Sequence, residues 1–186
     1  KAWEMGLKGI TVYRAGSRSG VMVSAKKKKE IEKNKYFCEN NAPKRPKILN
    51  ADVIRFVNGG ERWIGFVGLL DGKPYEIFTG NKDHFPIPDY VEKGKIKKYK
   101  VIAKKGERVN KYNFIFIDNK NEEVEVEGLS QAFSQEYWNY AKMISGVLRH
   151  GMPLLYIIDL VSNLKLNEDT LNNWKAGVTR MLKYYM

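Results

Sequence analysis

The sequence contains few of the residues that form disulfides or bind metals. Its 186 residues include one cysteine, Cys38, and two histidines, His84 and His150. A single cysteine excludes an internal disulfide and is typical of a reducing, cytoplasmic compartment. These three residues do not form a recognisable zinc-ligand set, because a zinc site needs several Cys or His ligands. We therefore expect this chain to bind no metal.

Long hydrophobic runs are also missing. No stretch approaches eighteen consecutive apolar residues, so we expect no membrane span and no membrane partner. The apolar run at the start is too short and too charged for a signal peptide. Hydrophobic residues still make up 43% of the chain and aromatic residues 12%. That is enough for a packed core, and the length suits one domain with an appendage.

The charge of the chain is strongly basic and unevenly distributed. The formal net charge is +12, and residues 1–50 hold 13 Lys/Arg against 4 Asp/Glu. Residues 51–186 hold 20 Lys/Arg against 17 Asp/Glu. The basic runs Lys26–Lys29 and Lys44–Lys47 are typical of a solvated tether. Clustered cations can also bind phosphate, but we do not expect specific nucleic-acid binding from this distribution.

Composition divides the chain into three parts. Residues 1–20 read as the end of a helix followed by a short strand, too little to bury a core. Residues 21–47 are rich in Lys, Asn and Ser and predict a basic linker. Cys38 lies in this linker beside aromatic residues, and we do not expect it to be catalytic. The folded domain is predicted over residues 48–186.

The first half of that domain predicts an antiparallel sheet of about six strands. The turns at Asn58–Gly60 and Asp71–Lys73 separate the first three strands into a meander. Gly65 and Gly68 are expected to leave one face of the second strand bare, so that a helix or another backbone can approach closely. The expected strands are 53–57, 63–70, 74–79, 96–103, 112–118 and a short one at 124–126.

The last third of the chain changes to helical periodicity. One apolar stripe runs from Phe133 to Leu148, with Ser130 or Ser134 as N-cap and Gly151 as C-cap. A second helix begins after Pro153. Asn167 is expected to cap a third helix that carries Trp174 and Met181. Three helices packed on an antiparallel sheet predict an α+β fold.

The opening residues resemble a known enzyme family. The string Ala2-Trp3-Glu4, Gly6-Leu7-Lys8-Gly9, Thr11-Val12-Tyr13-Arg14 and Gly16-Ser17-Arg18 is similar to the end of the catalytic barrel of class II, adenosylcobalamin-dependent ribonucleotide reductases. The resemblance implies that residues 1–20 are a C-terminal remnant of that barrel.

The folded domain carries a second, independent resemblance. Asp71-Gly72-Lys73-Pro74-Tyr75-Glu76-Ile77-Phe78 resembles the DG-x-P-[FY]-E-[VI]-F signature of the TSCPD domain. Ile144-Ser145, Leu148-Arg149 and Gly151 resemble its second signature. TSCPD domains lie at the C-terminus of many class II reductases, so the two resemblances agree in content and order. The Thr-Ser-Cys-Pro-Asp motif itself is missing here, because Lys165–Asp169 follows Leu164.

The resemblance implies a function for the parent protein rather than for this segment. The parent would convert ribonucleotides to deoxyribonucleotides with adenosylcobalamin, and its substrate could be a diphosphate or a triphosphate. The catalytic cysteines of the family lie elsewhere in the barrel, so we expect no catalytic, cofactor-binding or metal-binding residue in this chain. Its expected role is docking, contact between copies of the chain, or positioning of the family's C-terminal redox tail. The expected partner is the catalytic barrel, with a second copy of the chain left open.

Other candidate residues point to structural roles. His150 is expected to cap a helix, and His84 lies in a proline-bounded loop with no nucleophile near it in sequence. Glutamates 122, 123, 125 and 127 alternate along a strand and are expected to face solvent. Tyr137 and Tyr140 follow the core stripe, whereas Trp138 lies off it and is the best candidate for an exposed contact with a nucleobase. The alternative function is a free-standing module whose basic tether binds nucleic acid or nucleotide phosphates.

Overall fold

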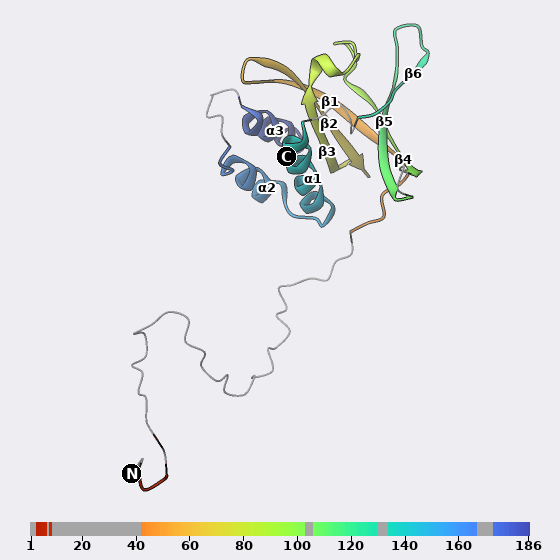
Figure 1. Ribbon diagram of the computed structural model, residues 1–186. Helices are drawn as coiled ribbons and strands as arrows, with labels where there is room; N and C mark the ends of the chain where they lie inside the picture. The colour runs from red at the N-terminus through yellow and green to blue at the C-terminus, as the bar shows by residue number, and fades with distance from the viewer. Residues whose placement is uncertain (1–2, 7, 9–41, 103–105, 130–133, 167–172) are drawn as a thin grey trace. The chain divides into compact units, whose positions relative to one another are not determined.

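The computed structural model describes residues 3–6, 8, 42–102, 106–129, 134–166 and 173–186. The chain divides into two units, Lys1–Glu39 and Asn40–Met186. In the first unit the described residues form a turn, in which the Gly6 N–H donates to the Trp3 carbonyl at 3.0 Å. The predicted barrel remnant and Cys38 otherwise lie outside the described residues. All the helices and strands that the structure describes belong to the second unit (Figure 1).

The sheet has six antiparallel strands, as predicted. Its order is β3-β2-β1-β4-β5-β6, so each of the two halves is a meander. Gly59 and Gly60 both have positive φ and close the β1–β2 turn, as the turn chemistry predicts. The strands are β1 (Ile48–Asn58), β2 (Glu61–Leu70), β3 (Lys73–Asn81), β4 (Lys93–Ile102), β5 (Arg108–Ile117) and β6 (Glu123–Val126), with the short 3-10 helix η1 (Lys82–His84) after β3.

The sheet is strongly curled. Three strands separate β3 from β5 in the sheet order, yet the rings of Phe78 on β3 and Tyr112 on β5 have centroids 5.0 Å apart. Curling of this kind follows from the right-handed twist that accumulates across successive strands. It brings the edge strand β3 close to the β4–β5 hairpin.

Three helices follow the sheet, which confirms the predicted α+β fold. They are α1 (Gln135–Arg149), α2 (Leu154–Ser162) and α3 (Trp174–Lys183), and Figure 1 shows them gathered beside β1, β2 and β3. His150 is the C-cap of α1, as predicted, and Gly151 follows it with a φ of 74°, the left-handed conformation expected of a glycine that ends a helix. The expected start of the third helix was wrong. Its N-cap is Asn173, whose side chain accepts from the Ala176 N–H at 2.9 Å, whereas Asn167 lies outside the described residues.

The two faces of the sheet bury two separate cores. Ile77 belongs to the core under the helices, which also contains Trp174, Met181 and the buried stripe of α1. Its neighbour Phe78 points to the opposite face, where it joins Phe66 and Phe114 in a second core. This alternation is what a strand with both faces covered requires.

Glycines allow α3 to approach the sheet closely. A Cβ on Gly65 would lie 2.2 Å from the Met181 sulfur, and one on Gly177 would lie 2.1 Å from the Phe56 ring. The expectation that Gly65 and Gly68 bare one face was wrong, because a spacing of three puts them on opposite faces. A Cβ on Gly68 would instead meet Glu76 at 2.8 Å.

The helices are short. None of the helices in the described part of the chain is long and apolar enough to cross a membrane.

Candidate functional site

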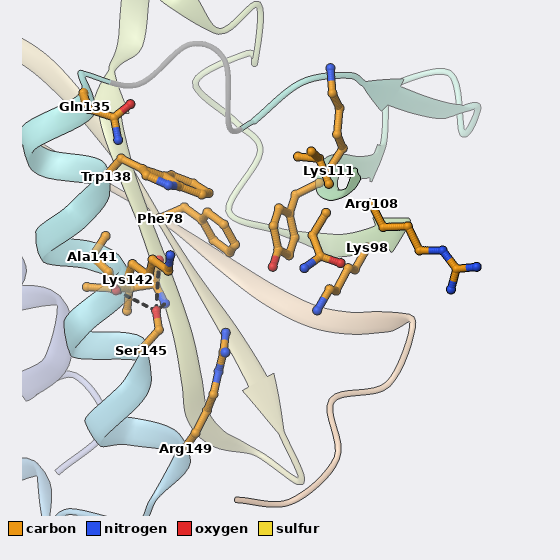
Figure 2. A pocket seen from close by; sticks show the side chains of 14 residues that line it. Phe78, Lys98, Arg108, Lys111, Gln135, Trp138, Ala141, Lys142, Ser145 and Arg149 are labelled. Atoms are coloured by element: carbon orange, nitrogen blue, oxygen red, sulfur yellow. Dashed lines mark hydrogen bonds between the residues drawn. The ribbon is translucent and has the colours of Figure 1, made fainter. Parts of the chain in front are cut away.

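A cleft of about 630 Å³ lies between α1 and the β4–β5 hairpin. Figure 2 shows side chains from α1 facing those of the hairpin across it, with Phe78 between them. The curl of the sheet creates this cleft, because it places the hairpin opposite the helix that covers β3. The lining residues are Ile77, Phe78, Lys98, Arg108, Val109, Asn110, Lys111, Tyr112, Gln135, Trp138, Ala141, Lys142, Ser145 and Arg149.

Regular spacing on α1 aims its lining side chains at the cleft, whereas the lining residues 108–112 of β5 are consecutive and alternate between the two faces of the sheet. On α1 the lining residues Gln135, Trp138, Lys142, Ser145 and Arg149 recur every three or four positions and form one stripe. This stripe is distinct from the apolar stripe that faces the core. The hairpin pairs Lys98 directly with Tyr112, which places both side chains on the same face of the sheet.

The cleft is strongly positive. Among the residues that the structure describes, its lining contains Lys98, Arg108, Lys111, Lys142 and Arg149 and no Asp or Glu. The pKa of Lys98 is lowered, first by its burial and then by the positive charges of Arg45 and Arg149. The small net charge of residues 51–186 therefore hides a local concentration of cations.

A buried ion-pair cluster lies next to the cleft. The Glu76 carboxylate accepts from Arg45 Nη2 at 2.6 Å and from Arg149 Nη2 at 3.0 Å. The Glu76 side chain is 1% exposed, that of Arg45 6% and that of Arg149 31%. Two arginines against one carboxylate leave a positive charge beside the cleft.

Aromatic rings support the two arginines. The Arg149 guanidinium lies 5.1 Å from the centroid of the Tyr75 ring, and that of Arg45 lies 5.5 Å from the Tyr112 ring. The Nε atom of Arg149 is buried and has no hydrogen-bond partner among the described residues. Arg149 is thus held in place but keeps one unused donor.

The two sequence signatures meet in this region. The Ser145 hydroxyl accepts from the Ile77 N–H at 3.0 Å and lies 2.7 Å from the Ala141 carbonyl. Ile77 lies on the edge strand β3, so the hydroxyl satisfies a backbone group that has no strand on that side. Together with the Glu76–Arg149 pair, this contact fixes α1 against β3.

An aromatic wall closes one side of the cleft. Phe78, Tyr112 and Trp138 form a triangle with centroid distances of 5.0, 5.6 and 6.3 Å. The pKa of Tyr112 is raised, mainly by burial. Trp138 lies off the helix-side core stripe, as predicted, but it is half-buried and packs against the second core where it lines the cleft, whereas Tyr137 and Tyr140 pack against the helix-side core.

The other residues considered from the sequence lie elsewhere. His150 follows the last residue of α1, and His84 ends η1. Glu125 accepts from Asn113 at 2.6 Å and from Lys97 at 3.0 Å, and these two hydrogen bonds lower its pKa. Among the residues that the structure describes, no three His, Cys, Asp or Glu side chains gather as metal ligands.

The cations of the cleft were not predicted from the sequence. Arg45 lies in the predicted linker, and Lys98 lies in a strand whose lysines resemble a solvated edge. Arg149 was considered only as part of the second signature. A second stripe on α1, polar and aromatic at helical spacing, was the signal that could have revealed the site.

A second surface feature is the outer face of α2. Leu155, Tyr156 and Leu160 are 59%, 64% and 43% exposed and lie within one arc of the helix. Exposed apolar side chains that gather in this way mark surfaces for contact with other proteins.

Comparison with known proteins identified one family. Residues 49–186 match the model of a family described as NrdJ homologue C-terminal domain. No curated protein and no solved structure matched the chain.

Proposed function

The chain belongs to the family of NrdJ homologue C-terminal domains, and from this premise we propose that it is a docking module of a class II ribonucleotide reductase. The match covers the sheet from the second residue of β1 onward and all three described helices. The family match therefore supports an association of this domain with a ribonucleotide reductase. Dependence on adenosylcobalamin and a TSCPD-type fold are the finer parts of the proposal.

The contact between the two signatures supports the TSCPD assignment. Glu76 and Ile77 of the first signature bind Arg149 and Ser145 of the second. Residues that act together in this way have a physical reason to occur together, since replacing one leaves a buried charge or backbone group without its partner.

Radical chemistry is assigned to the catalytic part of the reductase. The resemblance places the catalytic cysteines of the family in the barrel, so the proposal places no catalytic step and no adenosylcobalamin site in this chain.

The exposed face of α2 is the surface proposed to dock on the catalytic barrel. Leu155 and Tyr156 offer apolar contact area, and aromatic side chains at the centre of an interface contribute most to binding. The basic cleft suits an anion better than an apolar protein surface. The module therefore separates a docking face from the charged cleft.

Binding to the catalytic chain of the reductase from the same organism tests the proposal. We expect the full chain to bind it in titration calorimetry, and the double variant Leu155→Ser with Tyr156→Ser to bind at least about tenfold more weakly. Ile117→Ser is the matched control, because Ile117 is also exposed but lies on β5. Absence of any binding would overturn the docking role, and equal weakening by Ile117→Ser would overturn the assignment to α2.

A further inference from the structure

The cations of the cleft are largely without negative partners. Lys98, Arg108, Lys111 and Lys142 form no ion pair with any residue that the structure describes. Mutual repulsion among such groups disfavours the empty site, and an anion that enters it relieves that repulsion. The unused Nε donor of Arg149 adds a buried group that a ligand oxygen could satisfy.

The shape and the remaining lining narrow the class of anion. A volume of about 630 Å³ is far larger than an inorganic phosphate needs and lies within the range of small-molecule sites. Trp138 and Tyr112 are half-buried and present ring surface to the cleft. Asn110 and Gln135 place amide groups at its edge, which can both donate to and accept from a heterocycle.

Cations, aromatic rings and amides thus line a single space. Figure 2 shows Trp138 and Arg149 of α1 opposite Lys98, whereas the charged ends of Arg108 and Lys111 extend away from α1. We propose that the cleft between α1 and the β4–β5 hairpin binds a nucleoside polyphosphate, with the phosphates on Lys98, Lys142 and Arg149 and the base against Trp138 and Tyr112. This inference does not depend on the docking role of α2. It assigns a ligand class to a site that the docking proposal leaves unused.

Titration of the full chain with ATP, tripolyphosphate and adenosine tests the assignment. We expect ATP to bind at least about tenfold more tightly than tripolyphosphate, because stacking of the base adds to the phosphate contacts. Adenosine should bind far more weakly than ATP, because it makes none of the charged contacts. In an NMR titration, the indole N–H signal of Trp138 should shift, whereas that of Trp174, buried under the helices, should not.

A matched pair of charge variants locates the site. Lys98→Gln with Lys142→Gln should weaken ATP binding at least about tenfold. Lys120→Gln with Lys183→Gln removes the same charge from exposed positions outside the cleft and should weaken binding less than about twofold. Both variants keep the basic tail, so diffuse attraction to residues 1–41 affects them equally.

Three results would overturn the proposal. Equal binding of tripolyphosphate and ATP would show a general anion site. Equal weakening by the two double variants would show that net charge alone attracts the ligand. A 15-residue oligothymidylate that binds more tightly than ATP and loses affinity in the Lys98→Gln and Lys142→Gln variant would assign the cleft to single-stranded nucleic acid.

Discussion

Glu76 shows how one buried charge organises its surroundings. Removing a carboxylate from water is costly, and only close pairing with well-placed donors offsets that cost. Here the donors are Arg45 from before the sheet and Arg149 from the end of α1. The carboxylate thereby fixes the position of Arg149, whose side chain lines the cleft. A residue that touches no proposed ligand can in this way determine the shape of the site.

A phenol at the end of the chain carries a pH dependence of stability. The Tyr185 hydroxyl donates to Asp52 Oδ2 at 2.6 Å. Burial raises the pKa of Tyr185 above its usual value of 10.0, and the hydrogen bond and charge of Asp52 act in the same direction. The protonated phenol is therefore favoured in the folded state. Its contribution to stability is complete below pH 10 and declines as pH rises further, because the unfolded chain then releases a proton that the folded chain retains.

Replacing Tyr185 should remove its contribution to the free energy of unfolding and the pH dependence of that contribution. We expect Tyr185→Phe to lower the free energy of unfolding by about 1–3 kcal/mol at pH 7, since the hydrogen bond to Asp52 is lost. Urea unfolding at pH 7, 9 and 10.5 should show the difference from the parent chain shrinking above pH 10. Tyr184→Phe is the control, because Tyr184 is 76% exposed and should change stability by less than about 0.5 kcal/mol. A difference that stays constant up to pH 10.5 would contradict the role given to Tyr185.

At the scale of elements, two helical glycines predict opposite effects of one substitution. A Cβ on Gly177 of α3 would overlap the Phe56 ring of β1, whereas one on Gly146 of α1 would meet nothing within 4 Å. Gly177→Ala should therefore destabilise the fold by about 1–3 kcal/mol through overpacking. Gly146→Ala should stabilise it by up to about 1 kcal/mol, because alanine loses less entropy in a helix than glycine.

Urea unfolding of the two alanine variants checks this pair. Combining Gly177→Ala with Phe56→Leu tests the cause, because a smaller side chain on β1 should recover part of the loss. If Gly177→Ala leaves the midpoint unchanged, α3 does not approach the sheet as closely as described.

Helices and strands could be predicted from the sequence where they depend on residues close together in the chain. The strand at 74–79 and the left-handed glycine at position 151 follow from neighbouring residues, and both predictions were confirmed. The start of α3 was wrong because Asn167 and Asn173 are equally good caps in isolation, and the buried Trp174 follows the second. The cleft could not be predicted, because it exists only once the sheet curls and brings Tyr112 near Phe78.

At the scale of the whole molecule, the entry segment is part of the folded unit. Besides the Arg45 pair, the Pro43 carbonyl accepts from the Tyr75 hydroxyl at 2.7 Å, and that of Lys47 accepts from the Lys98 N–H at 2.7 Å. A short run rich in Lys and Pro resembles a tether in sequence, because nothing local reveals that Glu76 lies buried nearby. These contacts cover the start of β3 and connect it to β4.

Two truncations distinguish the contribution of residues 1–41 to stability from that of residues 42–47. We expect a chain that begins at Ala42 to have the same free energy of unfolding as the full chain, within about 0.5 kcal/mol, because it keeps every contact named above. A chain that begins at Ile48 should lose about 3 kcal/mol or more. This truncation removes Arg45, one of the two partners of the buried Glu76 carboxylate, and leaves the Tyr75 hydroxyl without its acceptor.

Single substitutions in the full chain show which side chain causes the loss of stability in the chain that begins at Ile48. Arg45→Gln should account for about 3 kcal/mol, the lower end for breaking a buried pair, because Arg149 still binds Glu76. Lys44→Gln removes the same charge from an exposed neighbour and should have almost no effect. If the chain that begins at Ile48 and the full chain unfold at the same urea concentration, the segment 42–47 contributes nothing and Glu76 is satisfied by Arg149 alone. If both truncations lose stability equally, the stabilising contacts lie upstream of Ala42 instead.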